Sequence, residues 1–134
     1  MEDCIFCKII KGEAKSWKVY EDDLVTAFFD INVASEGHTL IVPKKHYENI
    51  YDIPERELCE LMKVTKKLAV KYKDKLKINN VQILHSSGKE AQQDVFHFHL
   101  HLVPRHKGDD LDLSYKSHSE LNKNFDKLLE KLKK

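Results

Sequence analysis

The sequence lacks the features that secreted, membrane-spanning and repetitive proteins depend on. It contains three cysteines, an odd number that argues against a framework of disulfide bonds. The start, Met1-Glu2-Asp3, is acidic, and no apolar run is long enough for a signal peptide or a spanning helix. We see no internal repeat and no low-complexity linker. We therefore expect a cytoplasmic protein without a membrane partner.

An excess of charge of either sign is also missing. The chain has 23 basic and 22 acidic residues and a formal net charge of +1. That balance does not call for nucleic acid or an acidic partner, so we expect no nucleic-acid binding. A length of 134 residues with a hydrophobic fraction of 41% suits one domain with one core. We expect a single domain over 1–134, with its core at 4–105 and a C-terminal loop and helix at 106–134.

The most informative stretch runs from Val95 to Val103, where polar and apolar residues alternate strictly. This period of two predicts a strand with His97, His99 and His101 on one face and the apolar residues in the core. Side chains two residues apart on a strand are roughly 6.5–7 Å apart, so the outer two histidines lie roughly 13 Å apart. They are too far apart to share one small ion, and we expect one end of the row to be structural and the other chemical. A lone strand histidine is usually just half-buried, but packing alone gives no reason to repeat imidazole three times.

A second motif is the Cys4-Ile5-Phe6-Cys7 pair of thiols. The apolar spacing over 5–10 predicts a short helix that Gly12 ends, which places both thiols at its start. Such a pair can be redox-active, metal-binding or without function. Redox pairs normally follow a strand, and no strand fits before residue 4. Half of a zinc site fits better, with histidines supplying the other two ligands.

The remaining pattern predicts a mixed fold. Strands are expected at 16–20, 24–29, 39–42 and 81–84, a long helix from Pro54 to Leu76, and a last amphipathic helix from Leu121 to the end. His38 and His46 flank the strand at 39–42. His38 is a candidate to join the histidine row, and His46 is a candidate to complete the metal site.

Two loops offer polar groups to a ligand. Asp30, which follows a strand, could bind the hydroxyls of a ribose or could simply turn the chain. The loop at 85–94 carries hydroxyl, amide and lysine donors suited to phosphate, although such loops are also ordinary connections.

Together these motifs resemble the histidine triad (HIT) superfamily. The run 97–103 resembles its His-x-His-x-His signature, and 4–10, 28–30, 37–46 and Gln93 stand in the family's order and spacing. The resemblance is strongest to the Hint-like, zinc-bearing microbial branch. It implies an α+β domain with a five-stranded antiparallel sheet, a long helix and a C-terminal helix, usually paired into a homodimer.

The resemblance also implies site residues. His99 would be the nucleophile, and His38 and His101 would complete the catalytic histidine group. Ser86 and Gln93 would hold the phosphate and Asp30 the ribose. The base would lie against an apolar wall made of Ile5, Phe6, Ile9, Phe28 and Ile31. One structural zinc per chain would be bound by Cys4, Cys7, His46 and His97.

The implied activity is cleavage at the α-phosphate of a purine nucleotide conjugate, of the nucleoside phosphoramidate type, through a nucleotidyl-histidine intermediate. Dinucleoside polyphosphate hydrolysis, or a zinc-stabilised nucleotide-binding module with little turnover, are the alternatives. Two residues depart from the family's pattern. Asp94 stands where a hydroxyl residue is common, so the preferred kind of leaving group stays open. Ser86 stands where asparagine is common.

Overall fold

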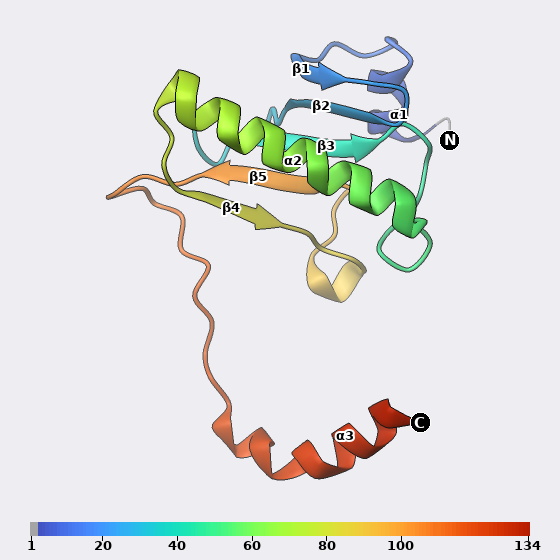
Figure 1. Ribbon diagram of the computed structural model, residues 1–134, viewed down its shortest axis with the longest axis vertical. Helices are drawn as coiled ribbons and strands as arrows, with labels where there is room; N and C mark the ends of the chain where they lie inside the picture. The colour runs from blue at the N-terminus through green and yellow to red at the C-terminus, as the bar shows by residue number, and fades with distance from the viewer. Residues whose placement is uncertain (1–2) are drawn as a thin grey trace.

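A five-stranded antiparallel sheet forms the centre of the protein (Figure 1). The computed structural model describes residues 3–134, so the Met1 and Glu2 part of the expected acidic start lies outside the described residues. The strands follow the spatial order β1-β2-β3-β5-β4. Their bounds are β1 Lys18–Glu21, β2 Val25–Phe29, β3 Thr39–Pro43, β4 Val81–Leu84 and β5 Leu100–Pro104. The α+β class and the antiparallel sheet predicted from the sequence are confirmed.

One helix covers each face of this sheet. The long helix α2, Glu55–Leu76, crosses one face (Figure 1) and buries a stripe that includes Leu61, Val64 and Leu68. The short helix α1, Ile5–Ile10, packs Phe6 and Ile9 into a separate cluster with residues of β2 and β3. Because side chains alternate along a strand, β2 and β3 supply residues to both cores.

One residue marks the end of α1, and another marks the start of α2. Gly12, just past α1, has φ +79°, a conformation that glycine adopts without strain, and this confirms its predicted role as the helix stop. Pro54 caps the start of α2.

The strand predicted over 95–103 is shorter than expected. β5 begins at Leu100, and the backbone before it is irregular. The N–H of Phe98 donates to the carbonyl of Tyr47, 2.6 Å away in the loop after β3, instead of to a neighbouring strand. The alternation of faces survives, since Phe98 lies in the core under α2. Phe96 was expected in the core, but 45% of its surface is exposed because the chain bends there.

The C-terminal segment leaves the sheet as an extended arm. After β5, Arg105 forms an ion pair with Asp109 (Nε to Oδ2, 2.8 Å) and the chain then runs away from the body (Figure 1). The predicted helix from Leu121 onwards is present as the 3₁₀ turn η2, Ser119–Asn124, followed by α3, Phe125–Lys133. Among the helices that the structure describes, none is both long and apolar enough to cross a membrane.

Candidate active site and metal centre

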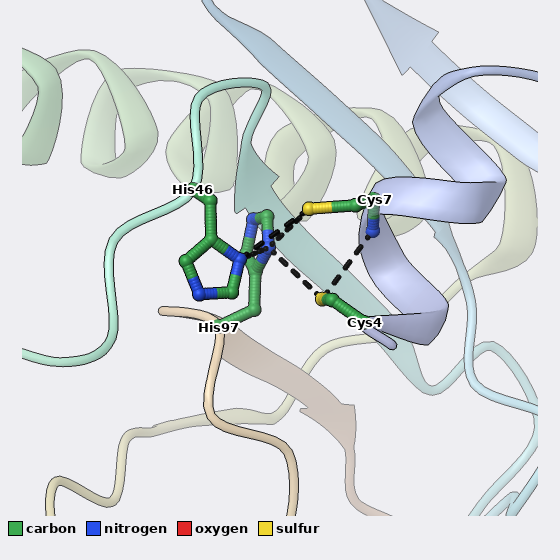
Figure 2. A group of neighbouring side chains, drawn as sticks. All are labelled: Cys4, Cys7, His46 and His97. Atoms are coloured by element: carbon green, nitrogen blue, oxygen red, sulfur yellow. Dashed lines mark hydrogen bonds between the residues drawn. The ribbon is translucent and has the colours of Figure 1, made fainter. Parts of the chain in front are cut away.

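Two cysteines and two histidines converge beside the start of α1. Cys4 caps this helix and Cys7 lies in its first turn, while His46 follows β3 and His97 precedes β5. One ligand-type atom from each of the four lies within 4.8 Å of the others. Figure 2 shows both rings and both sulfur atoms turned toward one another. The fold therefore brings together all four residues predicted to bind metal.

The spacing of these atoms fits a tetrahedral zinc ion. Zinc lies about 2.3 Å from sulfur and about 2.0–2.1 Å from imidazole nitrogen, so neighbouring ligand atoms are roughly 3.3–3.8 Å apart. Nδ1 of His97 is 3.4 Å from Sγ of Cys4 and 3.6 Å from Sγ of Cys7. Nδ1 of His46 is 3.3 Å from Sγ of Cys7 and 3.1 Å from Nδ1 of His97. These four residues could hold a metal ion with every position filled by protein.

Backbone hydrogen bonding prepares His97 for this role. Its Nε2 lies 2.9 Å from the carbonyl oxygen of Pro43, and because a carbonyl only accepts, Nε2 carries the hydrogen. Nδ1 then presents a lone pair to the cysteines, as a metal ligand requires. Burial lowers the pKa of His97 to about 4, so the ring is neutral at pH 7.

A cavity of about 350 Å³ opens next to this group, on the sheet face that α1 covers. Its polar wall contains Asp30, His38, His99 and His101. Its apolar wall contains all five residues predicted to hold the base, namely Ile5, Phe6, Ile9, Phe28 and Ile31. The cavity thus joins most of the predicted substrate site in one place.

His99 is held with one nitrogen free. Its Nδ1 lies 2.7 Å from the carbonyl oxygen of His97, so Nδ1 carries the hydrogen and Nε2 carries the lone pair. Within the part of the chain that the structure describes, the polar group recorded nearest to Nε2 is the carboxylate of Asp94, 3.7 Å away. Only 5% of the residue is exposed, and the ring of Phe6 meets it edge-on at 5.1 Å between centroids. Burial lowers the pKa of His99, which keeps the lone pair available.

His38 and His101 form a connected pair whose proton positions are also set by the backbone. Nδ1 of His38 accepts a hydrogen bond from the N–H of Ala34 at 3.1 Å, so the neutral ring carries its hydrogen on Nε2. That N–H faces Nδ1 of His101 at 2.9 Å, which leaves the hydrogen of His101 on Nε2. Burial is the main cause of the lowered pKa of His38 and of the fall in the pKa of His101 to about 4.

These tautomers argue against a second metal site in the cavity. Asp30, His38 and His101 are close enough to be considered as ligands. However, Nε2 of His38 carries a hydrogen where an ion would need a lone pair, and moving it to Nδ1 would set it against the N–H of Ala34. We therefore regard this cluster as a network of hydrogen bonds.

Asp30 has both of the roles considered for it within reach. Its Oδ1 accepts the N–H of Asn32 at 2.8 Å, which turns the chain after β2. Its Oδ2 is 3.5 Å from Nε2 of His38, inside the cavity. One oxygen thus shapes the loop, and the other faces the space that a ligand would occupy.

The two residues expected to hold phosphate lie elsewhere. Neither Ser86 nor Gln93 lines the cavity, as far as the described residues show. The Gln93 amide is used in the loop, where Oε1 accepts the N–H of Gly88 at 2.8 Å and Nε2 donates to the carbonyls of Glu48 and Val95 at 2.7 and 3.1 Å. Gln93 therefore has no spare N–H for phosphate in this arrangement. Its hydrogen bonds hold the loop that precedes the histidines.

Two charged residues of the cavity, Lys15 and Asp94, were not predicted to lie there. Lys15 lines the cavity and also lies over the ring of Trp17, with Nζ 4.9 Å from the centroid. A single lysine just before a strand gave no signal among so many others. Asp94 was noted only as a departure from the family's pattern, without a structural role.

Known proteins are similar to this chain over nearly its whole length. A sequence model described as the HIT domain matches residues 11–108. An adenosine 5'-monophosphoramidase of Saccharomyces cerevisiae is 43% identical over 102 residues, which cover 76% of this chain and 62% of that protein. The crystal structure of a HIT family protein from Bacillus anthracis superposes with a TM-score of 0.89 at 36% identity, covering 98% of this chain and 95% of that one. A zinc-bound histidine triad family protein from Mycobacterium smegmatis gives a TM-score of 0.79 at 32% identity, covering 98% and 96%.

Proposed function

This chain belongs to the histidine triad family of nucleotidyl hydrolases and transferases, and from that premise we propose that it cleaves purine nucleoside phosphoramidates at the α-phosphate. The observation that carries the proposal is the free Nε2 of His99, which is buried, neutral and turned into a cavity with an apolar wall. A yeast relative with this activity supports the choice of substrate class.

In the first step, the lone pair on Nε2 of His99 attacks phosphorus. The new N–P bond forms as the P–N bond to the leaving amine breaks, and the amine departs with that electron pair and a proton from solvent. The hydrogen on Nδ1 stays in place, because the carbonyl of His97 stabilises the positive ring that results. The Nε2–H of His101 donates to a phosphate oxygen, and His38 acts as a positioning residue that holds this tautomer.

In the second step, water attacks the phosphorus of the nucleotidyl-histidine. The bond to Nε2 breaks, the electron pair returns to the ring, and the proton of the water passes to solvent. The product is a nucleoside monophosphate, and His99 is restored. Neither step uses a metal.

The nucleoside would lie along the rest of the cavity. Purine rings are flat and apolar on both faces, which suits the wall of Ile5, Phe6, Ile9, Phe28 and Ile31. Asp30 would accept hydrogen bonds from the ribose hydroxyls, since its carboxylate already faces the cavity.

The metal centre would carry one structural zinc per chain. The donors of Cys4, Cys7, His46 and His97 are the sulfur and nitrogen ligands that zinc prefers, and they leave no open position. A zinc-bound relative with the same fold supports the identity of the ion. Its contribution would be to join the start of α1 to the chain just before β5.

The test is turnover of adenosine monophosphate joined through nitrogen to an amine, compared with a dinucleoside polyphosphate. His99→Ala should lower kcat/KM for the phosphoramidate by at least ~10³-fold, as loss of a nucleophile does. His106→Ala, which changes an exposed histidine outside the cavity, is the matched control and should leave the rate unchanged. Rapid quenching of the wild type should trap a nucleotidyl group on the protein that His99→Ala lacks. Preferred cleavage of the polyphosphate, or tight binding of both compounds without turnover, would refute the proposal.

The same proposal includes a homodimer, which the exposed apolar residues of the arm support. Four apolar side chains share one face of the amphipathic helix α3, and each of them is at least half exposed: Phe125, Leu128, Leu129 and Leu132. A second copy of the chain would cover that face. Sedimentation of the full chain should give a dimer, and Leu128→Asp combined with Leu129→Asp should shift it toward monomer. A monomeric wild type at micromolar concentration would refute this part.

A further inference from the structure

Asp94 places a carboxylate beside the nucleophile at the mouth of the cavity. Its Oδ1 is 3.7 Å from Nε2 of His99, although 77% of the Asp94 side chain is exposed. The N–H of Val95 donates to the same oxygen at 2.8 Å, which holds the carboxylate in this position. Any phosphorus that Nε2 attacks must therefore come close to a fixed negative charge.

A second cavity begins on the other side of Asp94. It has a volume of about 450 Å³ and shares Ile5, Asp94 and Val95 with the first cavity. Asp3 and Glu48 add two more carboxylates to its lining, and among the described residues neither lysine nor arginine lines it. Cys4 and His46 also border it, but two thiolates and one zinc ion would sum to no net charge. The acidic side chains of the lining, Asp3, Glu48 and Asp94, therefore meet no lysine or arginine side chain there, as far as the described residues go.

The two cavities would receive opposite ends of a nucleotide conjugate. Asp30, Lys15 and the apolar wall other than Ile5 belong to the first cavity only. With the nucleoside there and its phosphate at His99, the second cavity, which shares Asp94, offers room for the group attached to phosphorus. A leaving group with its own negative charge would add to the repulsion between phosphate and carboxylate, whereas a cationic group would relieve it.

We propose that Asp94 is a specificity residue that selects conjugates whose leaving group carries a positively charged amine, and that the second cavity receives this part. The inference rests on the proposed function and narrows it. The substrate class is a nucleoside phosphoramidate of a diamine or of a basic amino acid. The bonds made and broken are those described above, so Asp94 changes which leaving group is favoured and not the course of the reaction.

The experiment compares three conjugates of adenosine monophosphate that differ only at the far end of the amine. Putrescine leaves a distal ammonium group, butylamine leaves a methyl group, and γ-aminobutyrate leaves a carboxylate. The wild type should give kcat/KM values in the order putrescine, butylamine, γ-aminobutyrate. The first two should differ roughly tenfold, the factor for one pair of unit charges about 6 Å apart at an effective dielectric constant of about 40. Added salt should shrink the difference.

Asp94→Asn should bring the three values together, because it removes the charge and keeps the size of the side chain. Asp94→Ser retains an oxygen that can accept the Val95 N–H, and it should give the same change. Asp23→Asn removes an exposed carboxylate from the β1–β2 turn, outside both cavities, and is the control for net charge. It should leave the ratios as in the wild type.

The outcomes separate this inference from the function on which it rests. If the Asp94 variants lower all three rates by a common factor, Asp94 is only structural, and the inference fails while the proposed function stands. If the wild type cleaves the three conjugates equally, the inference also fails. If the wild type cleaves none of them, the proposed function fails and the inference with it.

Discussion

Removing one thiol from the proposed metal centre should affect both the stability of the fold and the activity. Cys7→Ser replaces a buried sulfur ligand with a hydroxyl, which is a poor ligand for zinc. If zinc affinity falls about 10³-fold and free zinc is then below the Kd of the variant, the free energy of unfolding drops by about 4 kcal/mol. For a chain of this size, that corresponds to a fall in Tm of roughly 10–20 °C.

The activity should fall as well, because His97 links the proposed metal centre to His99, the proposed nucleophile. The side chain of His97 is one of the four in the proposed metal centre, while its carbonyl oxygen accepts the Nδ1–H of His99 at 2.7 Å. Once His97 is free to move, the hydrogen bond that sets the tautomer of His99 loosens. We expect kcat to fall more than KM rises, since the cavity wall that holds the base does not include His97.

The assay is elemental analysis of protein purified without chelator, followed by thermal unfolding and kinetics of the same samples. Cys59→Ser is the matched control, because Cys59 is an exposed cysteine of α2 outside the metal group. Wild type and Cys59→Ser should carry one zinc per chain, and Cys7→Ser should carry much less. A wild type that holds no metal under these conditions, or a Cys7→Ser variant as stable as Cys59→Ser, would refute the reasoning.

Three further predictions follow from the buried rings and from one turn. Because burial lowers the pKa of His99 below its ordinary value of 6.5, its attacking nitrogen stays unprotonated below that pH, and kcat/KM should hold its plateau there and fall only at more acidic pH in a pH–rate profile. The folded pKa of His101 is about 4 against 6.5 in the unfolded chain, so its share of stability is complete above pH 6.5 and is lost as the pH falls through 4. That loss is at most about 3 kcal/mol, and urea unfolding of wild type and His101→Gln at both ends of the range should show it. Gly37→Ala should cost about 1–2 kcal/mol in urea unfolding, because its φ is +91° and a Cβ there would lie 3.3 Å from Cγ of Pro104.

Local patterns in the sequence were enough to place most of the elements. The predicted strands at 39–42 and 81–84 correspond to β3, Thr39–Pro43, and β4, Val81–Leu84. The helix predicted from Pro54 to Leu76 corresponds to α2, Glu55–Leu76. These signals succeed because a continuous apolar run closed by a proline suits a strand buried on both faces, and burial of one face of a helix requires a period of about 3.6. The structure also places His97 and His101 in different side-chain groups, as their separation along the chain predicts.

The sequence could not show where distant backbone groups take over from local ones. The strand begins only at Leu100 because the N–H of Phe98 donates to the carbonyl of Tyr47, a partner far away in the chain. Gln93 looked like a phosphate ligand by its position, but its amide bonds to the backbone around Gly88 and Glu48. In both cases a hydrogen-bonding group is used by a loop whose course no periodic pattern records.

The backbone also explains how one residue type can suit the three different roles proposed for it within a few ångströms. An imidazole ring has two nitrogens, and its chemistry depends on which one carries the hydrogen. The carbonyl of Pro43 accepts the Nε2–H of His97 and leaves Nδ1 for the proposed metal, whereas the carbonyl of His97 accepts the Nδ1–H of His99 and leaves Nε2 for the proposed attack on phosphorus. The N–H of Ala34 fixes His38 in the form that leaves His101 as a donor. A carbonyl cannot donate and an N–H cannot accept, so the main chain fixes which nitrogen of each ring carries the hydrogen before any ligand binds. Replacing one of the rings leaves its backbone partner in place.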